Sequence, residues 1–107
     1  MAQGTRYFED LSAVLRTVQA TLAGGQGTSL AEGLEHAIQL ILRSTGQGRK
    51  LMFIGNGGSA AIASHQAVDY WKNGGLRAVA FNDSSLLTCI GNDYGYYHIF
   101  EKPIEMI

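Results

Sequence analysis

The sequence predicts an α/β fold in which a parallel β-sheet is flanked by helices. Residues 50–54 and 76–81 are short apolar runs, typical of strands buried on both faces of a parallel sheet. A glycine-rich turn and an alanine-rich, helix-like segment separate the two runs, so residues 50–81 form one βαβ unit. Two amphipathic segments within residues 5–46 come before that unit and predict an N-terminal pair of helices.

The N-terminal helical pair is predicted from apolar residues that recur at spacings of three and four. The first helix is expected over residues 5–23, and the glycines within residues 24–27 end it. The second helix begins near Ser29, because Ser29 and Glu32 have the spacing of a capping box. It ends in the polar and glycine-containing residues 44–48.

The βαβ unit is predicted to continue into further helices. Between its strands a helix is expected over residues 60–71, and residues 84–91 and 96–107 are expected to form two more helical pieces. A parallel sheet of two strands is too small to be stable by itself. We therefore expect the chain to be part of a domain, truncated after its second strand, or to be completed by partner chains.

Composition and charge exclude several classes of protein. The chain has 107 residues, of which 14 are glycine and 1 is proline, and 46% are hydrophobic, which excludes collagen and intrinsic disorder. The net charge of −1 predicts no binding to nucleic acid. The uncharged run over residues 51–68 is interrupted by polar residues, and residues 1–10 lack the pattern of a signal peptide. We expect a cytoplasmic protein that does not enter the membrane.

The glycine-rich turn at residues 55–59, Gly-Asn-Gly-Gly-Ser, carries the clearest functional signal. Glycines let backbone N–H groups approach an anion or a sugar closely, and the positive end of the following helix points to the same place. The turn fits neither a dinucleotide-binding fingerprint nor an NTPase phosphate loop. Ligand binding and a purely structural strand-to-helix turn are both open from the spacing alone.

His65 and Asp69 are four residues apart in the predicted helix, so their side chains share one face. An imidazole and a carboxylate in this arrangement can share a metal ion or act together in proton transfer. A structural His–Asp pair is the other reading. Proximity to the glycine-rich turn favours the functional one, because the pair then lines the same crevice.

Polar and aromatic residues near the C-terminus have both structural and functional readings. Asn92 and Asp93 are expected in a loop after the second strand, either as turn residues or at the ligand-binding edge of the sheet. Asn82 and Asp83 lie at the same edge, and the pair is expected to cap the following helix. The aromatic residues within 94–97 offer either a stacking surface or a subunit contact. Cys89 has no basic neighbour, so we expect a buried thiol and not a nucleophile.

Three stretches together resemble the sugar isomerase (SIS) domain family, and most closely the phosphoheptose isomerases, also called sedoheptulose 7-phosphate isomerases. They are residues 53–61, the His65 and Asp69 pair, and residues 88–95. The resemblance runs through essentially the whole chain. It implies that the chain is the N-terminal part of a single SIS domain, with residues 5–46 as the helical pair and residues 50–107 as the βαβ unit and the helices after it.

The resemblance implies a three-layer, flavodoxin-like fold with five parallel strands, and a cytoplasmic homotetramer with active sites between subunits. The implied reaction converts sedoheptulose 7-phosphate to D-glycero-D-manno-heptose 7-phosphate. This product leads to nucleotide-activated heptose for lipopolysaccharide and other surface polysaccharides. A non-catalytic SIS protein that binds a sugar phosphate or regulates a partner is the alternative.

The resemblance also assigns roles to residues. Substrate contacts map onto Asn56, Gly57, Gly58, Ser59, Asn92 and Asp93. Zinc ligands map onto His65 and Asp69, of which Asp69 is the expected base and His65 its catalytic partner.

Two departures from the family pattern bear on these roles. The carboxylate here is Asp69, whereas the family has a glutamate, which is one methylene longer. The chain also ends before the family's Ser-rich phosphate-binding loop and the late helix that supplies a Gln and a His. Two zinc ligands are fewer than the three or four that zinc sites in proteins have, so we expect weak zinc binding by these 107 residues.

Overall fold

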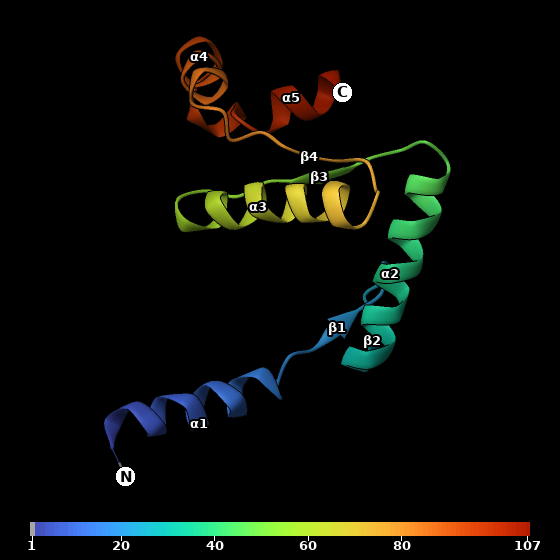
Figure 1. Ribbon diagram of the computed structural model, residues 1–107, viewed down its shortest axis with the longest axis vertical. Coiled ribbons are helices and arrows are strands. Elements are labelled where there is room, and N and C mark those ends of the chain that lie inside the picture. Colours follow the sequence, from blue (N-terminus) through green and yellow to red (C-terminus); the bar gives the residue numbers. More distant parts are fainter. Residues whose placement is uncertain (1) are drawn as a thin grey trace. The chain divides into compact units, whose positions relative to one another are not determined.

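The computed structural model describes residues 2–107 (Figure 1). The chain divides into two compact units, one ending at Leu40 and the other comprising Ile41–Ile107. Helix α2, Leu30–Gly46, crosses the division. Each unit has its own secondary structure, and the candidate site lies entirely in the second.

The first unit contains a helix and a hairpin before α2. Helix α1 spans Gln3–Leu15, and the short strands β1, Ala20–Thr21, and β2, Gly27–Thr28, pair antiparallel. The helix expected over residues 5–23 is therefore wrong beyond Leu15.

The hairpin replaces the end of the expected helix for local reasons. Thr17 and Val18 are β-branched and disfavour helix, and the Thr17 hydroxyl donates to the carbonyl of Val14, in the last helical turn, at 2.7 Å. The N–H of Leu22 then donates to the carbonyl of Gln26 at 2.8 Å, which closes the turn. Gly25 has a φ of 81°, a value that glycine adopts without strain.

Helix α2 begins as the capping box predicts. The backbone N–H of Glu32 donates to Ser29 Oγ at 3.2 Å, and the N–H of Ser29 donates to Glu32 Oε2 at 3.3 Å. The first turn packs closely on the hairpin, since a Cβ on Gly33 would lie 2.4 Å from the Cβ of Ala20. Only glycine fits at this contact, and the sequence pattern did not indicate it.

The second unit is built on the predicted βαβ unit. Strands β3, Leu51–Phe53, and β4, Ala78–Ala80, pair in parallel, with Met52 opposite Val79. Helix α3, Gly58–Val68, connects them and continues into a π-helical turn, η1, at Asp69–Asn73. The α/β class with a short parallel sheet and flanking helices is thus confirmed. Burial on both faces is wrong for β3, because Met52 is 39% exposed.

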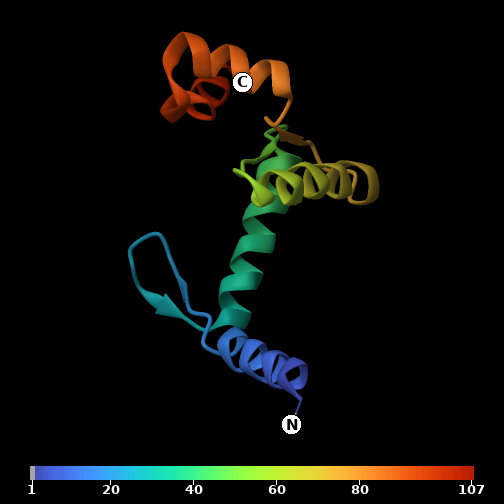
Figure 2. The ribbon, with the colours of Figure 1, turned by 90° about the vertical axis from the view of Figure 1, so that its left-hand side faces the viewer.

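The remaining helices follow β4. They are α4, Ser84–Tyr94, the 3-10 turn η2, Tyr96–His98, and α5, Glu101–Met106. Figures 1 and 2 both show the strands of the second unit running between α3 and the group formed by α4, η2 and α5. The buried residues of this unit are small in number and come from both sides of the sheet: Ala63, Ala67, Phe81, Ile99 and Pro103.

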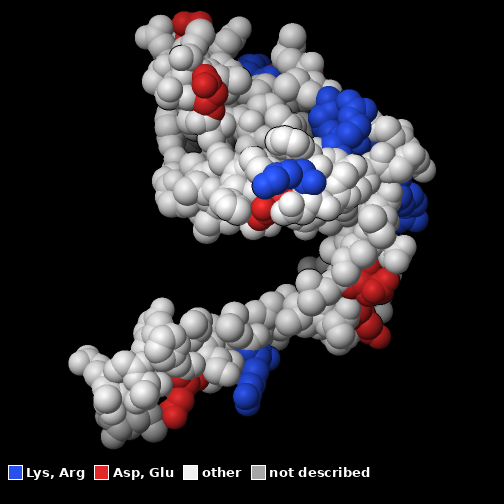
Figure 3. Space-filling model, in the orientation of Figure 1, with Lys and Arg blue, Asp and Glu red and all other residues white. Residues whose placement is uncertain are grey.

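Two surface properties bear on function. Within residues 2–107, no helix is both long enough and apolar enough to cross a membrane. On the face drawn in Figure 3, basic and acidic side chains are dispersed among uncharged atoms.

Candidate active site

The glycine loop, residues 55–59, leaves the carboxyl end of β3 and enters α3. A Cβ on Gly55 would lie 2.2 Å from the carbonyl oxygen of Ser59, so the loop closes on itself only because this residue is glycine. Gly57 has a φ of 61° and precedes the first residue of α3. Both features force the backbone into one tight turn at the carboxyl edge of the sheet, where α/β proteins bind ligands.

The loop leaves backbone donors free at the start of α3. The N–H of Ser59 donates to the carbonyl of Asn56 at 3.1 Å, and that of Ala60 to the carbonyl of Gly57 at 3.0 Å. No side chain caps the helix, and the N–H groups of Gly57 and Gly58 have no acceptor within residues 2–107. Free N–H groups at the positive end of a helix favour an anionic oxygen, such as that of a phosphate.

His65, in the last turn of α3, and Asp69, the first residue of η1, form the predicted pair. His65 Nδ1 lies 3.0 Å from Asp69 Oδ2, and the two side chains are 75% and 38% exposed. Asn73 Nδ2 donates to the other carboxylate oxygen, Oδ1, at 3.4 Å. Asp69 begins the π-helical turn η1, a feature that is common at functional sites. The carboxylate is therefore oriented by partners on both of its oxygens while staying open to a ligand.

A zinc ion does not fit the pair by itself. No three His, Cys, Asp or Glu residues gather closely enough to hold a metal in the part of the chain that the structure describes. His65 and Asp69 supply two donors, and these already face each other. A stable zinc site needs three or four protein ligands.

The Asn92–Asp93 pair lies in the last turn of α4 and not in a loop, so the expected location is wrong. Helix α4 runs through Gly91 without a break and continues to Tyr94. Gly95, with a φ of 91°, ends it. Asn92 Nδ2 donates to Asp93 Oδ1 at 3.1 Å. The two polar side chains therefore hold each other on one helical turn.

Cys89 lies one turn before Asp93 on α4. The thiol is exposed, which corrects the expectation of a buried residue. Its Sγ lies 3.6 Å from Asp93 Oδ2, and this hydrogen bond, together with the carboxylate charge, raises the pKa of Cys89. The raised pKa keeps the sulfur protonated, so the expectation that it is not a nucleophile agrees with its surroundings.

Two residues make polar contacts at the site that the sequence did not predict, namely Tyr96 and Asn82. The Tyr96 hydroxyl donates to Asn56 Oδ1 and so joins η2 to the glycine loop. Asn82, at the end of β4, donates to the carbonyl of Ala60 at 3.1 Å and to Ser64 Oγ at 3.2 Å. Asn82 therefore fastens the start of α3 to the sheet. Of the two residues expected to cap α4, Asp83 does so, because its Oδ1 accepts from the backbone N–H of Leu86 at 3.0 Å.

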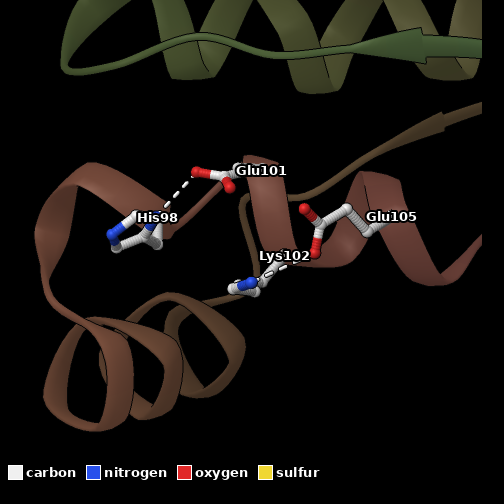
Figure 4. Close-up of polar contacts among 4 residues, drawn as sticks. All are labelled: His98, Glu101, Lys102 and Glu105. Carbon is white, nitrogen blue, oxygen red and sulfur yellow. Dashed lines mark hydrogen bonds and ion pairs between the residues drawn. The ribbon is translucent and has the colours of Figure 1, made fainter.

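A second His–carboxylate pair lies outside the candidate site (Figure 4). His98 Nδ1 is 2.6 Å from Glu101 Oε2, and the pair joins η2 to α5. The hydrogen bond from His98 holds the pKa of Glu101 below its ordinary value. Lys102 and Glu105 form an ion pair of 3.1 Å on the same helix. Of these contacts, the His98–Glu101 pair ties α5 to the segment that carries Tyr96.

The chain is similar in sequence and in structure to bacterial phosphoheptose isomerases. The chain is 37% identical over 105 residues to the phosphoheptose isomerase of Geotalea uraniireducens, covering 92% of this chain and 55% of that protein. It is 44% identical over 80 residues to that of Nitratidesulfovibrio vulgaris, covering 69% of this chain and 38% of that protein. The solved structure of phosphoheptose isomerase GmhA from Neisseria gonorrhoeae is 43% identical, with a TM-score of 0.66 over 73% of this chain and 42% of that one.

The chain is a homologue of the phosphoheptose isomerases. The resemblance seen in the sequence is thereby confirmed, and the similarity to GmhA confirms the fold class. No family model matches the chain. The chain spans about half the length of the curated relatives it matches.

Proposed function

We propose that the full-length protein is a phosphosugar aldose–ketose isomerase that converts sedoheptulose 7-phosphate to D-glycero-D-manno-heptose 7-phosphate. One observation carries the proposal. In this homologue of the phosphoheptose isomerases, the helical segment that starts at the glycine loop places His65 Nδ1 3.0 Å from Asp69 Oδ2. A phosphosugar has the anionic oxygens that suit the loop and the acidic carbon-bound proton that needs a base. The product would serve the synthesis of heptose for lipopolysaccharide.

Aldose–ketose isomerisation moves a proton between adjacent carbons through an enediolate. Asp69 is the proposed base: its carboxylate takes a proton from C1 of the ketose, exchanges it with solvent and delivers a proton to C2, while a proton passes from the hydroxyl on C1 to the oxygen on C2. His65 holds Asp69 Oδ2 from one side, and Asn73 holds Oδ1 from the other. The carboxylate is thus kept in one orientation. Precise orientation matters here, because aspartate is one methylene shorter than glutamate and a small displacement of a catalytic group lowers the rate strongly.

The glycine loop is the proposed binding surface for substrate oxygens. The free N–H groups of Gly57 and Gly58 and the side chain of Asn56 would donate to the phosphosugar, and Ser59 lies at the same turn. Asn92 and Asp93 are proposed to bind sugar hydroxyls from α4. We further propose that the protein is a cytoplasmic homotetramer, as the resemblance implies.

In the proposal, His65 and Asp69 would be two of the protein ligands of a zinc ion. Two donors do not make a zinc site, and the proton transfer proposed for Asp69 needs no metal.

The test is an assay of the purified full-length protein against a panel of ketose phosphates, with and without zinc. We expect turnover of sedoheptulose 7-phosphate above all other members of the panel. Tight binding of that sugar without turnover would instead support the non-catalytic SIS protein, which the aspartate in place of glutamate favours. Neither turnover nor binding of any member would overturn both proposals.

A further inference from the structure

Asn56 has a single side-chain hydrogen bond within residues 2–107, and it comes from far along the chain. The hydroxyl of Tyr96 donates to Asn56 Oδ1, and the two residues are 40 positions apart. Both lie in the unit Ile41–Ile107, on the glycine loop and on η2. The contact is therefore a tertiary link between the loop and the turn that follows α4.

This link decides which edge of the Asn56 amide faces a ligand. An amide has an acceptor oxygen and a donor NH₂ group, and a free asparagine can rotate to offer either. With Oδ1 occupied by Tyr96, the NH₂ group remains and presents two donors. The oxygens of a phosphosugar require donors, so the amide is held in the orientation that suits this ligand class.

The turn that carries Tyr96 is itself held firmly. Gly95 has a φ of 91° and directs the chain out of α4, and the N–H of His98 returns to the Gly95 carbonyl at 3.1 Å. His98 is tied to Glu101 at 2.6 Å, as Figure 4 shows, and Ile99 is only 4% exposed. The hydroxyl of Tyr96 thus comes from a fixed support, and a fixed support reduces the entropy that binding must overcome.

We propose that Tyr96 is a positioning residue that holds the Asn56 amide ready to donate to the oxygens of the phosphosugar. Tyr96 acts through Asn56 and does not itself take part in proton transfer. The inference rests on the proposed function for the identity of the ligand. The orientation of Asn56 is a property of the free protein and can be measured without turnover.

The test compares Tyr96→Phe with Tyr97→Phe in the full-length protein. Tyr97 is the matched control, because it is adjacent in sequence and 97% exposed. Loss of one hydrogen bond predicts a KM for sedoheptulose 7-phosphate raised by about five-fold in Tyr96→Phe, with kcat unchanged. Tyr97→Phe should leave both constants as in the wild type. In an Asn56→Ala background, Tyr96→Phe should have no further effect.

A second readout keeps the inference separate from the proposed function. In the ligand-free protein, the NMR signals of the Asn56 side-chain NH₂ should shift and broaden in Tyr96→Phe but not in Tyr97→Phe. If the wild type turns over no ketose phosphate while these signals respond as expected, the proposed function fails and the positioning of Asn56 stands. Unchanged Asn56 signals in Tyr96→Phe, or a fall in kcat at unchanged KM, would overturn the inference.

Discussion

The carboxylate of Asp69 is held on both of its oxygens, by His65 at 3.0 Å and by Asn73 at 3.4 Å. A carboxylate with fixed orientation and 38% exposure can meet a substrate without a large rearrangement. The chain offers a close structural match elsewhere, the His98–Glu101 pair, which lies in a different part of the second unit. The two pairs together allow the chemical role of Asp69 to be separated from its structural role.

Asp69→Asn should abolish isomerisation while leaving the fold intact. An amide keeps the size of the side chain but cannot accept a proton, and loss of a general base costs about 10²–10⁴-fold in rate. Steady-state kinetics and circular dichroism measure the two effects. Glu101→Gln removes the carboxylate charge of the other His–carboxylate pair in the same way and should keep wild-type kcat. Wild-type turnover in Asp69→Asn would remove this residue as the base.

Gly55→Ala should damage the glycine loop specifically. Its Cβ would lie 2.2 Å from the carbonyl oxygen of Ser59, so the loop must move, and a displacement of ~1 Å at a site can cost on the order of a hundredfold in kcat/KM. Gly46→Ala is the control, because nothing lies within 4 Å of its Cβ. Kinetics of both variants test the argument. Gly55→Ala with wild-type kcat/KM would show that the loop tolerates the shift.

Residue-level prediction from sequence worked where spacing alone places a side chain. The i, i+4 spacing of His65 and Asp69 fixes a shared helical face, and the structure places them in contact. Tyr96 could not be found in this way, because its partner Asn56 is 40 residues distant and only the turn at Gly95 brings them together. Asn92 and Asp93 were placed in a loop because Gly91 suggested a break that the helix does not make.

At the scale of elements, the start of α2 is a titratable unit. Glu32 accepts from the Thr28 hydroxyl at 2.6 Å and from the backbone N–H of Ser29 at 3.3 Å. The Thr28 bond, followed by the bonds from Ser29, lowers the pKa of Glu32 below 4.5. Because the folded-state pKa is lowered, the stabilising effect is present above pH 4.5 and is lost as the pH falls through the lowered value.

The first turn of α2 should therefore loosen in acid. Amide hydrogen exchange at Gly33, whose N–H donates to the carbonyl of Ser29 at 2.9 Å, should become less protected, after correction for intrinsic exchange, as the pH falls below 4.5. Glu32→Gln has no carboxylate and should not show this pH dependence. An identical acid response in Glu32→Gln would mean that another group controls the turn.

Elements with strong local signals were predicted well. The capping box fixed the start of α2, and apolar runs bounded by glycines fixed β3 and β4. The hairpin that begins within residues 16–23 is not predicted from the sequence. The apolar spacing there continues that of α1, whereas β-branched residues and the Gly25 turn favour a hairpin. Periodicity and turn chemistry disagree there, and the turn prevails.

At the scale of the whole molecule, the chain spans about half the length of the curated relatives it matches. The fold class followed from the βαβ pattern, but the two-unit division could not be predicted, because it depends on contacts and not on local pattern. The relatives are about twice as long as the matched region. We therefore expect the 107 residues alone to be inactive on sedoheptulose 7-phosphate, and robust turnover by them would contradict the proposed dependence on the rest of the protein.

The described residues also supply fewer zinc ligands than a stable zinc site needs. Two donors from His65 and Asp69 should bind zinc weakly in the 107-residue chain, and His65→Ala should remove that binding. Calorimetric titration with zinc alone measures both. Tight binding, or binding that survives His65→Ala, would show that other side chains hold the metal.

The most direct measurement follows the proton itself. Purified full-length protein is incubated with sedoheptulose 7-phosphate in D₂O, and the product is analysed by NMR. Isomerisation through an enediolate predicts the heptose 7-phosphate with deuterium at C2, formed by the wild type and by Glu101→Gln and not by Asp69→Asn. Absence of the aldose product from the folded wild-type protein, or its formation at the wild-type rate by Asp69→Asn, would contradict the proposed function of this site.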